Sequence, residues 1–170
     1  GYSGVTEASI AYTNNGESNA RPHPARILQL WEAPIRKTDL MMTRLQTARG
    51  DFAGLGIKFM SQSDASSLID GRALIESDWH VVMPGTGTLF VSQSENYWPY
   101  LKAVVLPAYW SSSKSWKGTW NGNITAGPGA LGTGRVVGGV GQFAGAESEV
   151  VEALAAREYS SRTGPVSLDG

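Results

Sequence analysis

Ten of the 21 glycines in the chain lie between Gly118 and Gly145. Tryptophan, threonine and valine stand between them, whereas the glycines of a flexible linker alternate with serine. A glycine inside a strand gives up side-chain packing and backbone entropy, so its repeated use indicates bulges, sharp corners or close approach of the backbone to a neighbour. A small, tightly curved barrel needs all three of these features. The segment therefore predicts a strongly curved antiparallel sheet.

Short apolar runs recur between turn signals from Ala25 onward and predict eight strands. The expected strands cover residues 25–33, 40–48, 51–60, 73–83, 87–93, 101–106, 115–125 and 147–156. Their regular spacing favours an all-β fold, and we expect an antiparallel barrel of eight strands. One alternative stays open, because residues 146–159 fit a helix nearly as well by propensity. A helix there would make the fold a β-dominated α+β variant.

The length of 170 residues allows one domain with its own core, and nothing in the sequence marks a second one. Residues 1–24 are polar, with an Asn-Asn-Gly turn signal and two prolines, and we expect an irregular arm there. The barrel domain is expected over residues 25–160 and a polar tail over residues 161–170.

The net charge is −1, from 14 basic and 15 acidic residues, and the sequence holds no run of lysine or arginine. Such a chain lacks the excess of basic residues that binds the phosphates of a nucleic acid, so we expect no nucleic-acid partner. No apolar run reaches the ~20 residues that span a bilayer, so we expect no membrane partner. The absence of cysteine excludes disulfides and thiolate nucleophiles. It is compatible with a reducing cytoplasm, which we prefer, and also with a secreted fold.

The sequence lacks the ligand sets of common cofactors. His23 and His80 are its two histidines, and His23 lies between two prolines in the expected arm. The glycines around Gly132 lack the lysine and the strand-to-helix context of a phosphate-binding loop. We therefore expect no metal and no cofactor.

Trp116 and Trp120 alternate with Gly118 and Gly122 on the even face of the expected strand 115–125. The odd positions hold lysine, threonine and asparagine, so the even face is expected to be buried. Large and small residues that alternate in this way fit the taper of a closed barrel and leave room for a flat ligand beside an indole. Core packing alone is the commoner explanation of such a stripe.

Residues 118–146 combine a G-T-x-x-G hairpin with the pattern G-x-G-x-F-x-G at Gly139, Gly141, Phe143 and Gly145. This segment resembles the closing segment of the allene oxide cyclase and dirigent-type barrels. The resemblance implies a calycin-like barrel of eight antiparallel strands, often assembled as a trimer. It also implies a cofactor-free cavity that steers the cyclisation or coupling of an apolar substrate. The matched residues are structural glycines, so the resemblance assigns no catalytic residue.

Glu76, Asp78 and His80 alternate along the expected strand 73–83 and share one face, about 6 to 7 Å apart. A carboxylate beside an imidazole orients the ring and raises its proton affinity, which suits acid–base catalysis. The alternative is an ordinary wet face, since antiparallel sheets commonly turn one side to water. We take Asp78 and His80 as the candidate catalytic pair, with Glu76 as a third member, if this face lines a cavity.

Aromatic side chains complete the expected site. The ligand would lie against Trp79, Trp116 or Trp120, with three further contacts at Phe90, Tyr97 and Trp31. The sequence thus predicts a cofactor-independent cyclase or isomerase that acts on a small apolar molecule in a barrel cavity. The alternative is a carrier or a binding module for carbohydrate or hydrophobic ligands. Either protein could work as a homo-oligomer, a dimer or a trimer.

Overall fold

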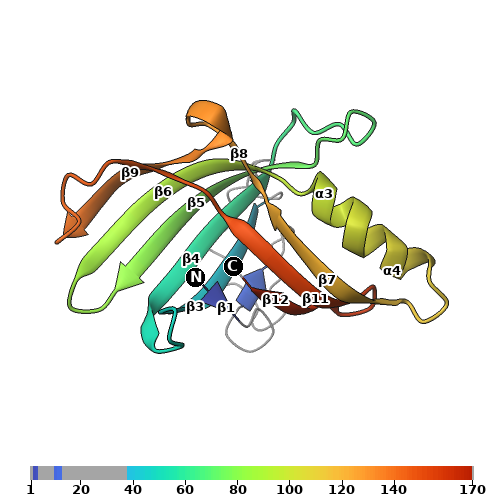
Figure 1. Ribbon diagram of the computed structural model, residues 1–170. Coiled ribbons are helices and arrows are strands. Elements are labelled where there is room, and N and C mark those ends of the chain that lie inside the picture. Colours follow the sequence, from blue (N-terminus) through green and yellow to red (C-terminus); the bar gives the residue numbers. More distant parts are fainter. Residues whose placement is uncertain (1, 4–9, 13–37, 170) are drawn as a thin grey trace, which may run out of the picture.

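The computed structural model describes residues 2–3, 10–12 and 38–169, and strands dominate these ranges (Figure 1). The strands are β1 (Tyr2–Ser3), β2 (Ile10–Tyr12), β3 (Thr38–Gln46), β4 (Phe52–Gln62), β5 (Leu74–Met83), β6 (Gly87–Asn96), β7 (Ser115–Asn123), β8 (Thr125–Gly127), β9 (Gly134–Gly141), β10 (Ser148–Val150), β11 (Ala153–Ser160) and β12 (Gly164–Asp169). The helical elements are α3 (Trp98–Tyr100), η1 (Leu101–Val105), α4 (Leu106–Trp110) and the short turn η2 (Ala130–Gly132).

The strands pair in antiparallel fashion in two sheets. The larger sheet has the order β1-β3-β4-β5-β6-β9-β10, with β2 also paired to β3 and β8 to β6. The smaller sheet has the order β12-β11-β7. The expected antiparallel, β-dominated fold is therefore confirmed. Within the described residues, however, the hydrogen-bonded ladders do not close into a single ring.

Two lengths of chain pass from one sheet to the other. β7 pairs with β11 in the smaller sheet and continues into β8, which pairs with β6 in the larger one. β10 pairs with β9 in the larger sheet, and the chain then enters β11 in the smaller sheet. Where they cross, the Ile124 N–H donates to the Glu152 carbonyl at 3.0 Å, and the Asn96 N–H donates to the Ile124 carbonyl at 2.7 Å. These bonds hold the two sheets together at one corner.

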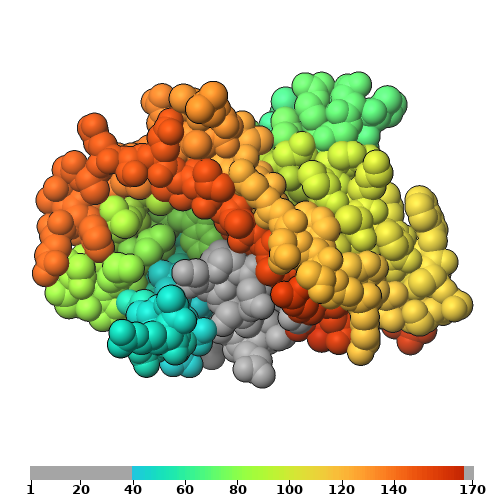
Figure 2. All heavy atoms as spheres, in the orientation of Figure 1, coloured from blue at the N-terminus to red at the C-terminus, as the bar shows by residue number. Residues whose placement is uncertain are grey.

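The sheets curve around a common interior (Figure 1). In Figure 2 the surface is hollowed between the orange β9–β10 region and the cyan turn between β3 and β4. At the other end of the interior, β12 lies beside β1, which is itself paired with β3. The two sheets thus enclose most of a circuit.

The expected strands 40–48, 51–60, 73–83, 87–93 and 115–125 are confirmed with small shifts, as β3 to β6 and as β7 with β8. Residues 147–156 form β10 and the start of β11, so the strand alternative holds for that segment and the helical one is wrong. Four further strands escaped prediction: the short β1 and β2 in the expected arm, β9 in the glycine-rich segment and β12 in the expected polar tail. The expected strand 25–33 lies outside the described residues, as does most of the expected arm.

The expected strand 101–106 is wrong, because residues 98–110 form one helical segment that runs through α3, η1 and α4. Tyr100, Val104 and Ala108 recur at helical spacing and are buried. Pro99 lies in the first turn, where a missing N–H costs nothing. The middle of the segment is a π-helix, Leu101–Val105, which precedes Pro107.

The helical segment packs on the tryptophan face of β7. Tyr100, Val104 and Ala156 form a buried cluster, and the half-buried Trp116 and Trp120 pack against it. The Trp120 ring meets the Tyr100 ring edge-on, with centroids 5.3 Å apart. A Cβ atom at Gly122 would lie 2.5 Å from the Trp120 ring, so only glycine fits beneath that indole. The tryptophan stripe therefore works as core packing between the smaller sheet and the helical segment.

Candidate functional site

The inner face of the larger sheet is polar where most sheets are apolar. On β4, Gly54, Gly56 and Lys58 are buried, and on β5 so are Ser77 and Trp79. On β6 the buried side chains are Val91, Gln93 and Glu95. All of these sit at alternate positions of their strands, so they share the enclosed side of the curved sheet.

Lys58 is the centre of this polar interior. Its side chain is 1% exposed and forms an ion pair with Glu95, which is fully buried. It forms a second ion pair with Glu152, at 2.9 Å. The Lys58 ammonium also donates to the Tyr97 hydroxyl at 3.4 Å and lies 5.0 Å from the centre of the Trp79 ring. We call Lys58, Glu95 and Glu152 the buried triad.

Glu152 is held by donors on every side. Its carboxylate accepts hydrogen bonds from Lys58, from the Trp79 indole N–H at 3.2 Å and from the Gln93 amide at 2.5 Å. Its own backbone N–H donates to the Thr125 hydroxyl at 2.7 Å. These donors fix the position and the orientation of the Glu152 carboxylate. Glu152 therefore serves as the fixed negative partner of Lys58.

Glu95 is the group in the triad whose proton can move. Its Oε1 atom accepts hydrogen bonds from Ser77 at 2.9 Å and from Gln93 at 2.7 Å. Its Oε2 atom is buried and has no hydrogen-bond partner among the described residues. Burial raises the pKa of Glu95 to about 7, against the attraction of Lys58 and with the help of the negative charge on Glu152. Near neutral pH this carboxyl can both donate and accept a proton.

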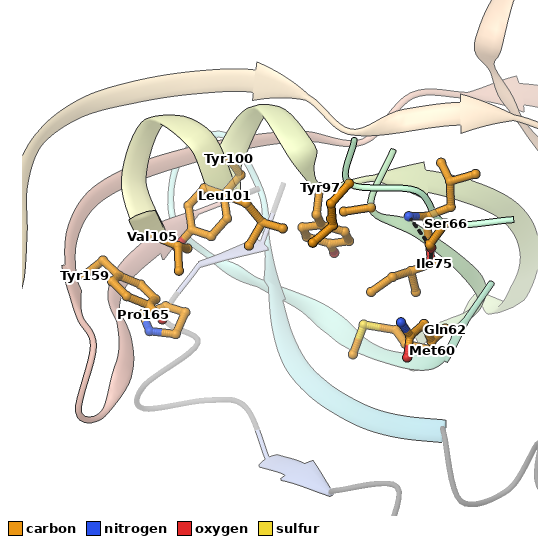
Figure 3. Close-up of a pocket in the computed structure, with 13 residues that line it drawn as sticks. Met60, Gln62, Ser66, Ile75, Tyr97, Tyr100, Leu101, Val105, Tyr159 and Pro165 are labelled. Carbon is orange, nitrogen blue, oxygen red and sulfur yellow. Dashed lines mark hydrogen bonds between the residues drawn. The ribbon is translucent and has the colours of Figure 1, made fainter. Parts of the chain in front are cut away.

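A cavity of about 680 Å³ lies between the helical segment and the inner ends of β4 and β5 (Figure 3). Met60 and Ile75 line it from the sheet side, and Tyr100, Leu101 and Val105 line it from the helical side (Figure 3). The wall also includes the phenol rings of Tyr97 and Tyr159 and the pyrrolidine ring of Pro165. The thirteen described residues that line the cavity are all uncharged. The space suits a small, mostly apolar molecule.

The cavity and the buried triad adjoin each other. Ile75, in the cavity wall, is the cross-strand partner of Glu95. Met60 lines the cavity two residues after Lys58, on the same face of β4. Tyr97 lines the cavity and accepts the hydrogen bond from Lys58. The three triad residues are not themselves among the described residues that line the cavity, and Ile75 and Tyr97 connect the two.

The predicted catalytic residues lie on the other side of the sheet. Glu76 and Asp78 are exposed on the outer face of β5, and Glu76 accepts a hydrogen bond from Ser94. His80 packs edge-on between the outward-facing rings of Phe59 and Phe90, at 5.3 and 5.0 Å. None of the three lines the cavity or contacts the triad. Their position on the outer face gives an acid–base role in the cavity no support.

The predicted aromatic contacts separate into three groups. Tyr97 lines the cavity, and Trp79 contributes its indole N–H to the triad. Trp116 and Trp120 pack against the helical segment, and Phe90 lies on the outer face beside His80. Trp31 lies outside the described residues.

The buried triad was not predicted from the sequence. Lys58 and Glu95 each lie in a strand with an ordinary sequence pattern. A single charged residue in such a pattern is normally predicted to be exposed to solvent. A signal was nevertheless present in β4, where Gly54, Gly56 and Lys58 share a face. Two glycines on one face leave space for the neighbouring strands' large side chains, and the Trp79 ring indeed lies against Gly56, where a Cβ atom would meet it at 2.6 Å.

Within residues 40–166, whose side chains the structure describes, no three histidine or acidic side chains come together as metal ligands would. No helix in the described ranges is long and apolar enough to cross a membrane. Comparison of the chain with protein-family models, with curated proteins and with solved structures finds no match.

Proposed function

We propose that this protein is a cofactor-independent isomerase or cyclase, in which Glu95 moves a proton on a small apolar substrate held in the cavity. The observation that carries the proposal is the composition of the buried triad. One lysine faces two carboxyls away from water, so one negative charge is in excess and is relieved when Glu95 takes up a proton. A purely structural ion pair has no need of the second carboxyl.

The roles of the three residues follow from their contacts. Glu95 takes a proton from one position of the substrate and returns it to another, so the composition of the substrate is unchanged. Lys58 stabilises the Glu95 carboxylate before it takes up the proton and again after it has returned it. Glu152 holds Lys58 in place and is itself fixed by Trp79 and Gln93. The apolar walls keep water away from the reacting atoms.

The finer architecture belongs to the same proposal. We propose that the two sheets act as one barrel of the allene oxide cyclase and dirigent type, with the triad in its interior. Three features support this: the strands that cross between the sheets at Ile124 and Glu152, the position of β12 beside β1, and the polar residues on the enclosed face.

A carrier without chemistry remains the second candidate. The favouring observation is that Glu152 is satisfied by so many donors, which is also how a structural ion pair is built. A carrier would bind ligands in the same cavity but would not need Glu95 to change its protonation state.

A base-catalysed test reaction separates the two. Elimination of 5-nitrobenzisoxazole needs one carboxylate in an apolar site and no cofactor. The wild-type protein should accelerate it, with a rate that rises with pH about a midpoint near 7, since the base is the ionised form of Glu95. Glu95→Gln should lower kcat/KM at least tenfold, because a general base contributes about 10² to 10⁴ in rate.

Three further variants make the result specific. Glu147→Gln removes an exposed carboxylate and should leave the rate unchanged. Asp78→Asn and His80→Gln test the rival site on the outer face of β5. Loss of rate in those two, with wild-type rate in Glu95→Gln, would transfer the catalytic role to that face. A protein that binds the fluorescent amine N-phenyl-1-naphthylamine but gives no elimination above buffer would be a carrier.

A further inference from the structure

The outer face of the larger sheet carries a continuous patch of apolar and aromatic side chains. Leu55 and Phe59 on β4 are each 41% exposed, and cross-strand partners on β3, β5 and β6 extend the area to both sides. An exposed apolar area that spans four strands marks an interaction surface, whereas apolar side chains scattered singly do not. We call the following six residues the outer patch: Met42, Leu55, Ile57, Phe59, His80 and Phe90.

Two charged side chains stand at opposite corners of the outer patch. Arg44 is exposed on β3 beside Leu55, and Asp78 is exposed on β5 beside Phe59. Neither forms an ion pair with another of the described residues. The two positions are two strands and four residues apart, about 17 Å on a flat sheet, so the two side chains cannot pair within one chain.

Ile57 lies midway between these two charges. It is one strand away from each of them, two residues after Leu55 and two residues before Phe59. A two-fold axis that passes through Ile57 in the plane of the face, at right angles to the line from Arg44 to Asp78, therefore exchanges the two charged positions. Two copies related by this axis place Arg44 of each chain against Asp78 of the other.

The same axis sets apolar side chains against one another. On a flat sheet with strands ~4.8 Å apart and alternate residues ~6.8 Å apart, Ile57 meets its own counterpart and Phe59 falls near Met42. His80 falls near Leu55. The strands of the two copies then cross at about 70°, close to the orthogonal class of sheet packing. A face that is complementary to itself in both charge and apolarity favours a second copy of the chain over a protein of different sequence.

We infer that two copies of this chain associate through the outer patch as a symmetric dimer, with Ile57 on the two-fold axis and an Arg44–Asp78 ion pair on either side of it. The patch covers about 19 by 20 Å, or roughly 400 Å² of flat area on each copy, which is at the small end for protein interfaces. The dimer should therefore be weak and in exchange with the monomer. The inference is independent of the proposed function, because the outer patch and the buried triad lie on opposite faces of the larger sheet.

Sedimentation equilibrium of the wild-type protein, over about 1 µM to 1 mM, tests the inference. The weight-average mass should rise with concentration from the monomer value toward twice that value. Ile57→Lys sets two ammonium groups against each other on the axis and should weaken the association at least tenfold. Val151→Lys is the matched control. It introduces the same group at an exposed apolar position outside the patch and should leave the association unchanged.

An exchange of charges tests the pairing of the two corners. Asp78→Arg sets arginine against Arg44 at both ends of the interface, and Arg44→Asp sets aspartate against Asp78. Each substitution occurs twice in the dimer and should weaken it about tenfold or more. The double variant R44D/D78R restores both pairs of opposite charge, so its dissociation constant should return to within about threefold of the wild-type value. Circular dichroism and thermal unfolding check that every variant is folded.

The inference is overturned if the wild type stays monomeric over the whole concentration range, which would leave the outer patch to a partner of different sequence. A limiting mass of three or four chains would overturn it as well, and so would a dimer that Ile57→Lys does not weaken. A double variant that associates no better than either single variant would overturn the Arg44–Asp78 pairing and with it the two-fold arrangement. None of these outcomes bears on the elimination assay with Glu95→Gln, so the two proposals fail separately.

Discussion

The Lys58 ammonium donates hydrogen bonds to both carboxylate oxygens of Glu152, at 3.1 and 2.9 Å, across 94 residues of sequence. Lys58 lies in the middle of the larger sheet, and Glu152 lies at the corner where the chain leaves it for the smaller one. Burial of such a pair is costly, and the cost is offset only while both partners are present.

Removal of the Lys58 charge should therefore lower the stability of the fold strongly. Lys58→Met leaves Glu152 and Glu95 buried without a counter-charge, and we expect the free energy of unfolding at pH 7 to fall by about 3 to 5 kcal/mol. Urea denaturation followed by tryptophan fluorescence measures it. The matched control is Lys117→Met, which breaks an exposed pair with Glu158 at 3.0 Å and should cost less than about 1 kcal/mol. Equal losses in the two variants would show that the buried pair adds nothing.

Glu95 makes a second prediction, on pH. Because its pKa is about 7 in the folded protein and 4.5 in the reference state, the folded protein binds the proton more tightly than the unfolded chain between these values. Its contribution to stability is thus fully present below about pH 4.5 and is lost as the pH rises through 7. The full loss amounts to about 3 kcal/mol.

The measurement is a series of urea denaturation curves from pH 5 to pH 8.5, for wild type and for Glu95→Gln. Glutamine does not titrate, so the variant should lack this part of the pH dependence. Identical pH dependence in the two proteins would mean that Glu95 is ionised throughout, and the proposed proton transfer would lose its basis.

The strands from β3 to β6 could be predicted because their alternation is regular, but the alternation does not say which face is enclosed. Phe59 and Phe90 suggest that their face is the core, yet both lie on the outer face, while the polar Lys58 and Glu95 lie inside. The usual rule that apolar residues face inward fails here, because the enclosed face of the larger sheet holds the buried triad. Asp78 and His80 were the sequence-based choice because they place a carboxylate and an imidazole two residues apart on one strand face, and that face is the outer one.

The helical segment was missed for a different reason. The run Leu101 to Leu106 is short and apolar, and periodicity cannot tell a buried strand from a buried helix at that length. The residues at the N-terminus of the segment favour a helix. The Asn96 side chain accepts a hydrogen bond from the Trp98 N–H at 3.0 Å, and Pro99 follows in the first turn. An asparagine shortly before a proline is a helix-start signal that the apolar pattern concealed.

Gly122 makes a third prediction. The Trp120 ring covers this glycine, and a Cβ atom there would lie 2.5 Å from the ring. Gly122→Val should therefore displace the indole from Tyr100 and lower the free energy of unfolding by roughly 1 to 3 kcal/mol. Thr119→Val, at an exposed position of the same strand, should change it by less than about 0.5 kcal/mol. An unchanged melting temperature in Gly122→Val would contradict the packing of Trp120 on the backbone.

We expect the same substitution to have opposite effects on stability at two buried threonines. The Thr43 hydroxyl is buried without a hydrogen-bond partner among the described residues, so Thr43→Val removes a desolvated polar group and fills the same space. The Thr125 hydroxyl donates to Gln93 at 2.9 Å and accepts from the Glu152 N–H at 2.7 Å, so Thr125→Val leaves two buried partners unsatisfied.

Thermal unfolding compares the two variants directly. Thr43→Val should be neutral or stabilising, by up to about 1 kcal/mol, whereas Thr125→Val should cost about 1 to 3 kcal/mol. Because the substitution is the same, hydrophobicity and strand propensity largely cancel between the two proteins, and the difference reports the hydrogen bonds. Destabilisation of similar size in both would mean that Thr43 has a partner, and equal stability in both would mean that the Thr125 hydroxyl does not support the buried triad.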